Sequence, residues 1–406
     1  MILREKILAQ LEQKYEQFLD FDRDFEDEAV RYSARLKDLA QWSSAELTDK
    51  LQDIATPGAL PTAEFDAAPG LQVPFPHQWN NHQEARAWAC EVLLNHPTVA
   101  VDGSQIKPDQ DYSLPIAAVQ VAWFLNHHTR DGRYVKDTVV QVLSPKDLLV
   151  ELNGEKVVSE QTVNACRFEL EVATLCARIE ELAAQRSATS PLPVALPVAL
   201  FDSSLVISFA DRLQEEMRDK HVKAMLRLLR CSRDAAVPVV GYVDASRARD
   251  LVHMLKHCFD LNDAEKLQDA QLINALLPWG GRTPMFVCAR GGADQNKPGV
   301  LESFGSEFKR GIGFVYLKAS ATAPPARLEI PLWVYEQGLL DSVLDIVRAE
   351  IIVGNGYPYI IEAADAAAVI TARDREAFYA LFQRFAQDRK MDLRLSQKAA
   401  SKARRR

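Results

Sequence analysis

An apolar stretch that ends in an acid occurs twice in this chain, and it constrains the fold more than any other feature. Thr98–Val101 runs into Asp102, and Val198–Phe201 runs into Asp202. Small and β-branched residues in such a run predict a buried strand. Each acid is followed by a small residue and a serine, which favour a turn. The two strands are therefore expected to bring two carboxylates to one edge of a sheet.

Two carboxylates this close repel each other unless a cation lies between them. A long helix is expected at about 160–185, between the two acidic strands, and Glu169 and Glu171 lie in its first half. A helix packed across a sheet can place one of these glutamates over the strand ends. Three carboxylate ligands suit Mg²⁺ or Mn²⁺. Two such ions about 4 Å apart can activate a water and stabilise the leaving oxygen of a phosphodiester.

The composition indicates a large folded protein and excludes several classes. The 406 residues are 48% hydrophobic, and no apolar run reaches the ~18 residues that a membrane helix needs. The net charge of −8 argues against a broad basic surface, so a polyanion would bind at a local basic patch or a metal cleft. The six cysteines form no CxxC pair and are expected to be reduced thiols in the core. With no signal-peptide core at its N-terminus, the protein is expected in the cytoplasm, without a membrane partner.

The order of the expected elements indicates the fold class. Strands are expected at 116–124, 134–143, 148–152 and 156–158, ahead of the long helix and the second acidic strand. An apolar strand at 237–243 ends at Asp244, which is expected to cap the next helix. A carboxylate strand, further strands, a carboxylate helix and a second carboxylate strand resemble the RNase H-like fold. We therefore predict an α/β protein with an RNase H-like mixed sheet flanked by helices and a helical N-terminal arm.

Three regions are expected along the chain: an N-terminal helical arm and linker (1–82), a main domain (83–390) and a basic, disordered tail (391–406). The apolar residues of the arm recur every three or four positions, at Leu3, Ile7, Leu11, Tyr15 and Phe18. This stripe packs either on its own domain or on a second subunit, and the sequence leaves both open.

Five short motifs follow one another in order between about residues 95 and 385. They are Val101–Asp102–Gly103–Ser104, Phe201–Asp202–Ser203–Ser204–Leu205, Arg327–Leu328–Glu329–Ile330–Pro331, the run from Gly356 to Asp365 with Ala368–Val369–Ile370, and Asp374–Arg375–Glu376–Ala377–Phe378–Tyr379. Together they resemble the NurA nuclease family. The resemblance implies a metal-dependent DNA nuclease, usually with Mn²⁺, that degrades 5′ ends and cuts single strands. It also implies a homodimer docked to a hexameric HerA-type ATPase, with single-stranded DNA and duplex ends as substrates.

The resemblance also implies the ligands of the metal. Asp102 and Asp202 match the family's ligands, and Glu171, which falls four residues after Arg167, matches the third. Glu169 stays open as the alternative to Glu171.

Further residues of the site follow from the same resemblance. Tyr357 matches the family's active-site tyrosine, and Ser104 and Arg167 are expected to bind substrate. Where many members have Ala–His, this chain has Ala364–Asp365. We include Asp365 in the catalytic group, as a carboxylate rather than as a cation that faces phosphate.

Two alternatives keep other functions open. The protein could keep the fold as an inactive interaction subunit that docks on a DNA-translocating ATPase. A nucleotide-binding enzyme that uses the Asp–Gly–Ser turn is a third hypothesis, although the chain has no glycine-rich phosphate loop followed by Lys and Ser or Thr. The pair His127–His128 follows an apolar strand and is expected to face solvent at its end, with a position near the cleft as the alternative.

Overall fold

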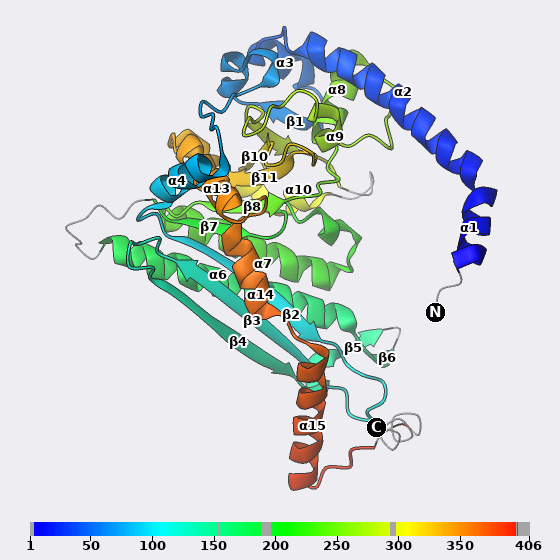
Figure 1. Cartoon of the computed structure of the whole chain (residues 1–406). Helices are drawn as coiled ribbons and strands as arrows, with labels where there is room; N and C mark the ends of the chain where they lie inside the picture. Colours follow the sequence, from blue (N-terminus) through cyan, green and yellow to red (C-terminus); the bar gives the residue numbers. More distant parts are fainter. Residues whose placement is uncertain (1–3, 153, 188–195, 293–297, 395, 397–406) are drawn as a thin grey trace. The chain divides into compact units, whose positions relative to one another are not determined.

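The computed structural model describes residues 4–152, 154–187, 196–292, 298–394 and 396 (Figure 1). The chain forms two compact units, each made of two segments: Met1–Gln78 with Tyr242–Leu332, and Trp79–Gly241 with Trp333–Arg406. The division of the chain at residues 82 and 390 into arm, main domain and tail stays a prediction. Most of the predicted tail lies outside the described residues.

The second unit is built around a mixed sheet. Its strands are β2 (Thr98–Ile106), β3 (Ala117–Asn126), β4 (Tyr134–Leu143), β7 (Val198–Phe201) and β8 (Val239–Val243), through which the chain passes to the first unit. β3 is antiparallel to β2 and β4, whereas β7 is parallel to β2 and β8 is parallel to β7. The order β4-β3-β2-β7-β8 confirms the predicted RNase H-like mixed sheet.

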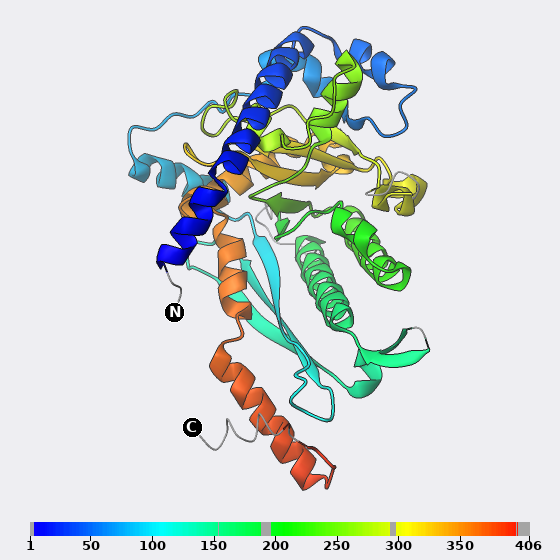
Figure 2. The same ribbon diagram turned by 90° about the vertical axis from the view of Figure 1, so that its right-hand side faces the viewer.

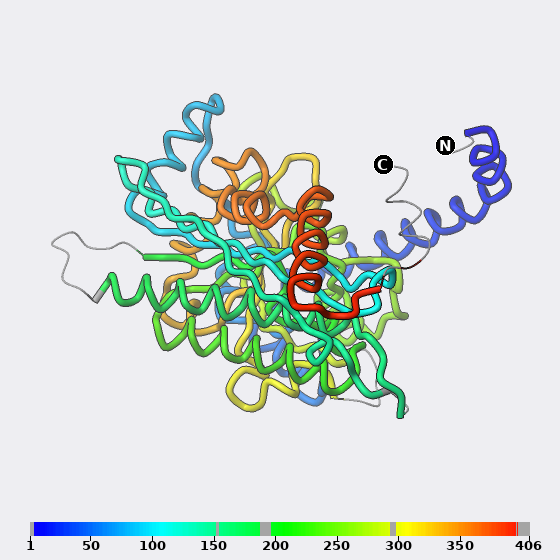
Figure 3. Tube along the Cα trace, turned by 90° about the horizontal axis from the view of Figure 1, so that it is seen from below, coloured from blue at the N-terminus to red at the C-terminus, as the bar shows by residue number. Residues whose placement is uncertain are grey.

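Helices cover both faces of this sheet. α6 (Glu160–Ser187) and α14 (Tyr359–Ala368) each pack on β2 and β3, from opposite sides (Figure 2). α7 (Glu215–Asp234) lies beside α6 (Figure 3). The other elements of the unit are α4 (His82–Leu93), α5 (Pro145–Leu148), the hairpin of β5 (Leu149–Leu152) and β6 (Glu155–Val158), the 3₁₀ helix η3 (Ser208–Arg212), α12 (Leu332–Glu336), α13 (Leu340–Val353) and α15 (Ala372–Asp388).

α14 is a helix that the sequence pattern does not predict. It opens with Tyr359, Ile360 and Ile361, which favour strands, and continues with alanines, which favour helix. Ile360 and Ile361 are buried together with Ala364 and Ala368. Spacings of three and four residues put this set on one helical face, so packing on the sheet outweighs the local strand preference.

The first unit contains an antiparallel sheet and the N-terminal arm. The sheet order is β1 (Gly58–Pro61), β9 (Phe286–Ala289), β10 (Ile312–Leu317) and β11 (Ala326–Pro331). The predicted helical arm is confirmed as α1 (Arg4–Gln13), α2 (Tyr15–Leu39) and α3 (Ser44–Leu51). The remaining helices are η1 (Ala63–Ala67), η2 (Pro69–Leu71), α8 (Asp250–Phe259), α9 (Asp269–Ile273), α10 (Val300–Ser303) and α11 (Gly305–Phe308).

A buried network of charged side chains joins the strands and helices of the first unit. The guanidinium of Arg327 contacts Asp250 at 2.8 Å and Glu329 at 2.8 Å, and all three side chains are at most 2% exposed. Arg290 also pairs with Asp250. Arg327 and Glu329 belong to the motif Arg-x-Glu-x-Pro of β11, so this motif holds the first unit together. Paired and hydrogen-bonded charges are tolerated in a core, whereas a lone charge is costly.

One acid of this network, Asp269, has a pKa raised to about 6 by burial and by the charge of Asp250. Its oxygens accept hydrogen bonds from the Val252 N–H and the Tyr316 hydroxyl, each at 3.0 Å. When folding raises the pKa of an acid, the protonated form of that acid stabilises the folded state more than the ionised form does. Between pH 4 and 6, its ionisation therefore lowers the free energy of unfolding by on the order of 1 kcal/mol per pH unit.

We expect Asp269→Asn to remove this contribution. The stability of the variant relative to the wild type should rise from pH 4 to 6, since only the wild-type residue ionises there. Urea unfolding at several pH values measures the difference. Asp53→Asn, a change at an exposed acid of the same unit, is the control and should show a constant difference. A constant difference for Asp269→Asn as well would contradict the prediction.

The described residues can be checked for membrane-spanning helices and for the state of the cysteines. None of their helices is long and apolar enough to cross a lipid bilayer. The six cysteines are free thiols; Cys176, Cys258 and Cys288 are buried in the core as expected, whereas Cys90 is exposed.

Candidate metal centre

The register of two parallel strands brings Asp102 and Asp202 together. Phe201 of β7 lies opposite Val101 of β2, so the next residue of each strand occupies neighbouring positions. Adjacent strands lie about 4.8 Å apart. β7 ends at Phe201, whereas β2 continues to Ile106, and Asp202 is consequently exposed at the open end of the shorter strand.

Asp102 points toward α14 on one side of the sheet. Its carboxyl group lies within hydrogen-bonding reach of the carboxyl group of Asp365, which is exposed on that helix. The sequence places these two residues 263 positions apart (365 − 102). Asp365 thus lies beside Asp102, the acid that follows the first of the two apolar runs.

Glu171 approaches from α6, on the other side of the sheet. It is only 9% exposed, and its charge interacts with those of Asp102 and Asp202. Glu169 is exposed. Because residues two apart point to nearly opposite sides of a helix, only one of the two glutamates can face the sheet, and it is Glu171.

Gly103 explains how the glutamate comes so close to the strand. A Cβ atom on Gly103 would lie 2.4 Å from the Glu171 Oε1 and 2.9 Å from the Arg167 Cγ, so only glycine leaves room for both side chains. Arg167 donates a hydrogen bond from Nη1 to the Gly103 carbonyl at 2.9 Å, and its Nε lies 3.6 Å from Glu171. The arginine therefore bridges the strand and the glutamate.

Tyr357 closes the group on the side of Asp202. Its hydroxyl donates a hydrogen bond to the Asp202 Oδ1 at 2.6 Å. The residue lies in the segment between α13 and α14, at Gly354–Pro358, directly before the helix that carries Asp365. The backbone makes a tight turn there, since a Cβ on Gly354 would lie 1.9 Å from the Tyr357 carbonyl oxygen.

We call Asp102, Glu171, Asp202 and Asp365 the acidic cluster, and two of its members, Glu171 and Asp102, have a raised pKa. The pKa of Glu171 is raised to about 7, first by burial, with Arg167 opposing and Asp102 and Asp202 adding to the shift. The pKa of Asp102 is raised to about 6 by burial and by the charges of Asp365 and Asp202, against a hydrogen bond from the Gly103 N–H. Repulsion of this kind favours either a proton or a cation among the carboxylates.

The donor set of the acidic cluster fits a hard divalent cation. Carboxylate oxygens are the ligands that Mg²⁺ and Mn²⁺ prefer. In the described part of the chain, however, no three His, Cys, Asp or Glu side chains are arranged closely enough to hold an ion as they stand. Asp102 and Asp365 lie within hydrogen-bonding reach of each other, so a cation bound between them would replace that contact.

Ser104 lies two residues beyond Asp102 in β2. Side chains alternate along a strand, so Ser104 shares the face of Asp102, the side of α14. Its role as a substrate-binding residue stays a prediction, as do the roles of all members of the acidic cluster, of Tyr357 and of Arg167.

A buried residue that the sequence analysis missed, Glu350 of α13, positions the elements of the site. It is 0% exposed and accepts hydrogen bonds from the Thr98 hydroxyl at 2.7 Å and from the Ile360 N–H at 3.0 Å. Thr98 begins β2, and Ile360 lies in the first turn of α14, so Glu350 ties the strand of Asp102 to the helix of Asp365. The available signal was that Glu350, like Arg348, interrupts the otherwise apolar run 346–352.

The histidine pair after β3 is not solvent-facing, so that expectation is wrong. The Nε2 of His128 lies 3.0 Å from the Glu350 Oε1 and 2.8 Å from the Thr98 hydroxyl, and His127 is only 7% exposed. His128 has a φ of 49°, so the chain turns back there rather than extending into solvent.

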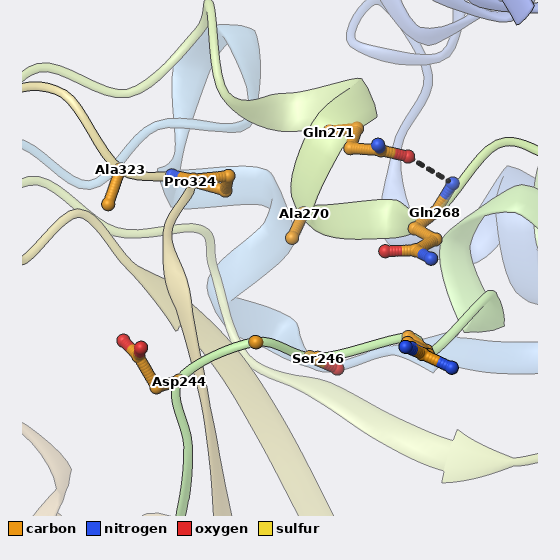
Figure 4. A pocket seen from close by; sticks show the side chains of 9 residues that line it. Asp244, Ser246, Gln268, Ala270, Gln271, Ala323 and Pro324 are labelled. Atoms are coloured by element: carbon orange, nitrogen blue, oxygen red, sulfur yellow. Dashed lines mark hydrogen bonds between the residues drawn. The ribbon is translucent and has the colours of Figure 1, made fainter. Parts of the chain in front are cut away.

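A concavity in the first unit holds none of the predicted site residues. It encloses about 210 Å³ and is lined by Asp244, Ser246, Gln268, Gln271 and Pro324, among others (Figure 4). The predicted capping role of Asp244 is wrong, because α8 begins at Asp250 with Arg249 at its N-cap. Gln271 accepts a hydrogen bond from the Gln268 N–H at 3.1 Å, and Ser246 accepts one from the Ala248 N–H at 3.2 Å. These polar groups are thus already used within the protein.

Comparison with known proteins places the acidic cluster in a family context. Residues 96–370 match the sequence model of the family described as NurA domain. A crystal structure of NurA with manganese is 10% identical, with a TM-score of 0.39, and the match covers 71% of this chain and 89% of that one. A crystal structure of NurA bound to dAMP and manganese is 11% identical, with a TM-score of 0.34 and coverage of 80% and 91%. No curated protein matches the chain.

Proposed function

This chain belongs to the NurA family of nucleases, and from that premise we propose that it is a divalent-metal-dependent deoxyribonuclease. The convergence of Asp102, Glu171, Asp202 and Asp365 at one strand end carries the proposal. All four residues lie inside the matched segment 96–370.

In the proposed mechanism, Asp102, Glu171 and Asp202 hold Mn²⁺ or Mg²⁺, with Asp365 as a further carboxylate of the site. The bound ions would supply a nucleophilic water and stabilise the charge of the leaving oxygen. Burial of Glu171 between α6 and β2 fixes its side chain, and Arg167 keeps it oriented from the side. The protein's contribution is therefore the fixed placement of oxygen ligands on rigid elements.

The polar neighbours of the acidic cluster are proposed to act on the substrate. Tyr357 donates to Asp202 and is placed to contact a phosphate or a water with the same hydroxyl. Arg167 is 39% exposed at its side chain, so it can reach a phosphate while its Nη1 stays on Gly103. Ser104, on the same face as Asp102, is the third proposed substrate contact.

The finer features come from the family. We propose that the enzyme degrades 5′ ends of DNA duplexes and cuts single strands during end processing in repair. We propose that it works as a cytoplasmic homodimer docked to a hexameric HerA-type ATPase, which supplies the energy for DNA movement. The described residues of this chain show no glycine-rich phosphate loop, so ATP hydrolysis is assigned to the partner.

The proposal is tested with DNA labelled at its 5′ end. We expect the wild type to release labelled nucleotides with Mn²⁺, to stop when a chelator is added, and to resume when Mn²⁺ is restored. Asp102→Ala should release no label under the same conditions. If both proteins were equally active or both inert, this chain would not be a nuclease of the proposed type.

The alternative function is an inactive subunit that docks on a DNA-translocating ATPase. The observation that favours it is Asp365, a carboxylate at the position where the family resemblance implies histidine. Calorimetric titration with Mn²⁺ separates the two functions. A nuclease should bind the metal in a way that Asp202→Asn abolishes, whereas the inactive subunit would bind weakly and independently of Asp202.

Replacement of Tyr357 by phenylalanine should slow cleavage about tenfold, the cost of one hydrogen bond to a charged group. The ring is retained, so Asp202 loses only a donor. Initial rates at saturating Mn²⁺ measure the effect. Tyr359→Phe, two residues away and 37% exposed, is the matched control and should leave the rate unchanged. Equal rates for wild type and Tyr357→Phe would remove the tyrosine from the site.

A further inference from the structure

The N-terminal arm has an apolar seam that its own unit covers only in part. Along α1 and α2, seam residues follow one another at alternating steps of three and four: Arg4, Leu8, Leu11, Tyr15, Phe18, Asp22, Phe25, Ala29, Tyr32, Leu36 and Leu39. A repeat of this kind, sustained over several turns, is the pattern of a helix that packs lengthwise against another helix.

The C-terminal half of the seam is occupied within the first unit. Tyr32, Leu36 and Leu39 are at most 2% exposed, and α2 packs there against α8 and α9. The Tyr32 hydroxyl donates to the Asn262 carbonyl at 2.8 Å. This half shows that the seam spacing marks a real packing face of the helix.

No described residue of the first unit buries the N-terminal half of the same seam in this way. Leu8, Leu11, Tyr15 and Phe18 are 47–54% exposed, and α1 has no buried residue. Figure 1 shows α2 running past α8 and α9, with α1 continuing beyond them. The helix is interrupted only at Lys14, and the seam spacing continues through this residue.

We propose that this free half-seam pairs with the same segment of a second copy of the chain, in antiparallel orientation. In an antiparallel helix pair centred near Gln13, Leu8 lies opposite Phe18 of the second copy, and Leu11 lies opposite Tyr15. The two charged seam residues, Arg4 and Asp22, then also lie opposite each other. Every layer is thus apolar on apolar or positive on negative.

Charge selects this arrangement over a parallel pair. In a parallel pair each seam residue meets itself, so Arg4 would face Arg4 and Asp22 would face Asp22, and like charges in a helix seam are repulsive. The charged residues that flank the seam favour the same antiparallel orientation. Residues 4–14 carry three basic and two acidic side chains, whereas residues 16–28 carry one basic and seven acidic ones. Only the antiparallel orientation places the basic end beside the acidic end.

Cysteine crosslinking of the full-length protein tests the orientation. In a Cys90→Ser background, which removes the exposed native thiol, L8C and F18C proteins are mixed and oxidised. We expect a disulfide between L8C of one copy and F18C of the other. Q13C, at an outward position of the same helix, is the control and should not crosslink. Disulfides of L8C with L8C, or no crosslink at all, would overturn the pairing; the second result would point to another protein as the occupant.

A charge exchange gives a second test that does not need cysteine chemistry. Arg4→Asp alone should weaken self-association about fivefold by sedimentation equilibrium, since it places two acids opposite each other. Arg4→Asp with Asp22→Arg should restore it, because the opposite charges meet again. Failure of the double variant to recover would overturn the antiparallel pairing. DNA cleavage by the same variants is measured separately, since the arm lies outside the matched segment 96–370. The pairing and the nuclease proposal can therefore fail independently.

Discussion

Glu171→Gln should lower Mn²⁺-dependent DNA cleavage by roughly a thousandfold, which corresponds to a loss of about 4 kcal/mol in transition-state stabilisation. The substitution keeps the size of the side chain and removes its negative charge. Glu171 is buried beside Gly103 and interacts with Asp102 and Asp202, so its charge acts directly on the proposed metal site. Single-turnover rates at several Mn²⁺ concentrations measure the effect and separate weaker metal binding from slower chemistry.

The control is the neighbouring glutamate of the same helix. Glu169→Gln removes the same charge at an exposed position of α6, and cleavage should stay within twofold of the wild type. Both variants should keep the wild-type circular dichroism spectrum. A large loss in Glu169→Gln with none in Glu171→Gln would reverse the assignment of the third ligand. Equal activities in both variants would remove α6 from the metal site.

Glu350→Ala should lower the free energy of unfolding by about 3 kcal/mol, the cost of breaking a buried charged network by removing one partner. The substitution leaves the Thr98 hydroxyl, the Ile360 N–H and His128 without their common acceptor. It also opens a space where a 0% exposed side chain was packed. Chemical denaturation followed by fluorescence measures the loss.

We also expect Glu350→Ala to lower catalysis, because Glu350 lies between the strand of Asp102 and the helix of Asp365. Glu350 contacts Thr98, four residues before Asp102 in β2, and Ile360, five residues before Asp365 in α14. At a temperature where the variant is still folded, cleavage should fall and the Mn²⁺ concentration at half-maximal rate should rise. Glu362→Ala, at an exposed position of α14, is the control for loss of a glutamate near this helix. Unchanged stability in Glu350→Ala would contradict the proposed tie between strand and helix.

Much of the second unit could be predicted from local pattern. The apolar runs that end at Asp102 and Asp202 are strands β2 and β7, and the amphipathic stretch between them is α6. These elements obey short-range rules of period and turn chemistry, so the sequence alone was sufficient. The helix α14 was missed because its first residues favour strands, and burial on the sheet outweighs that preference.

Some features of the site also follow from the sequence, whereas others depend on tertiary packing. The sequence determined which residue types end the two strands and that a carboxylate helix lies between them, because these facts follow from neighbours along the chain. The tertiary structure decided that Glu171 rather than Glu169 faces the sheet, since the rotation of α6 is set by packing on the sheet. It also decided that Asp365 lies beside Asp102 and that Glu350 contacts Thr98, in both cases between residues more than 240 positions apart. Burial, register and helix rotation are properties of the packed chain, and no local pattern contains them.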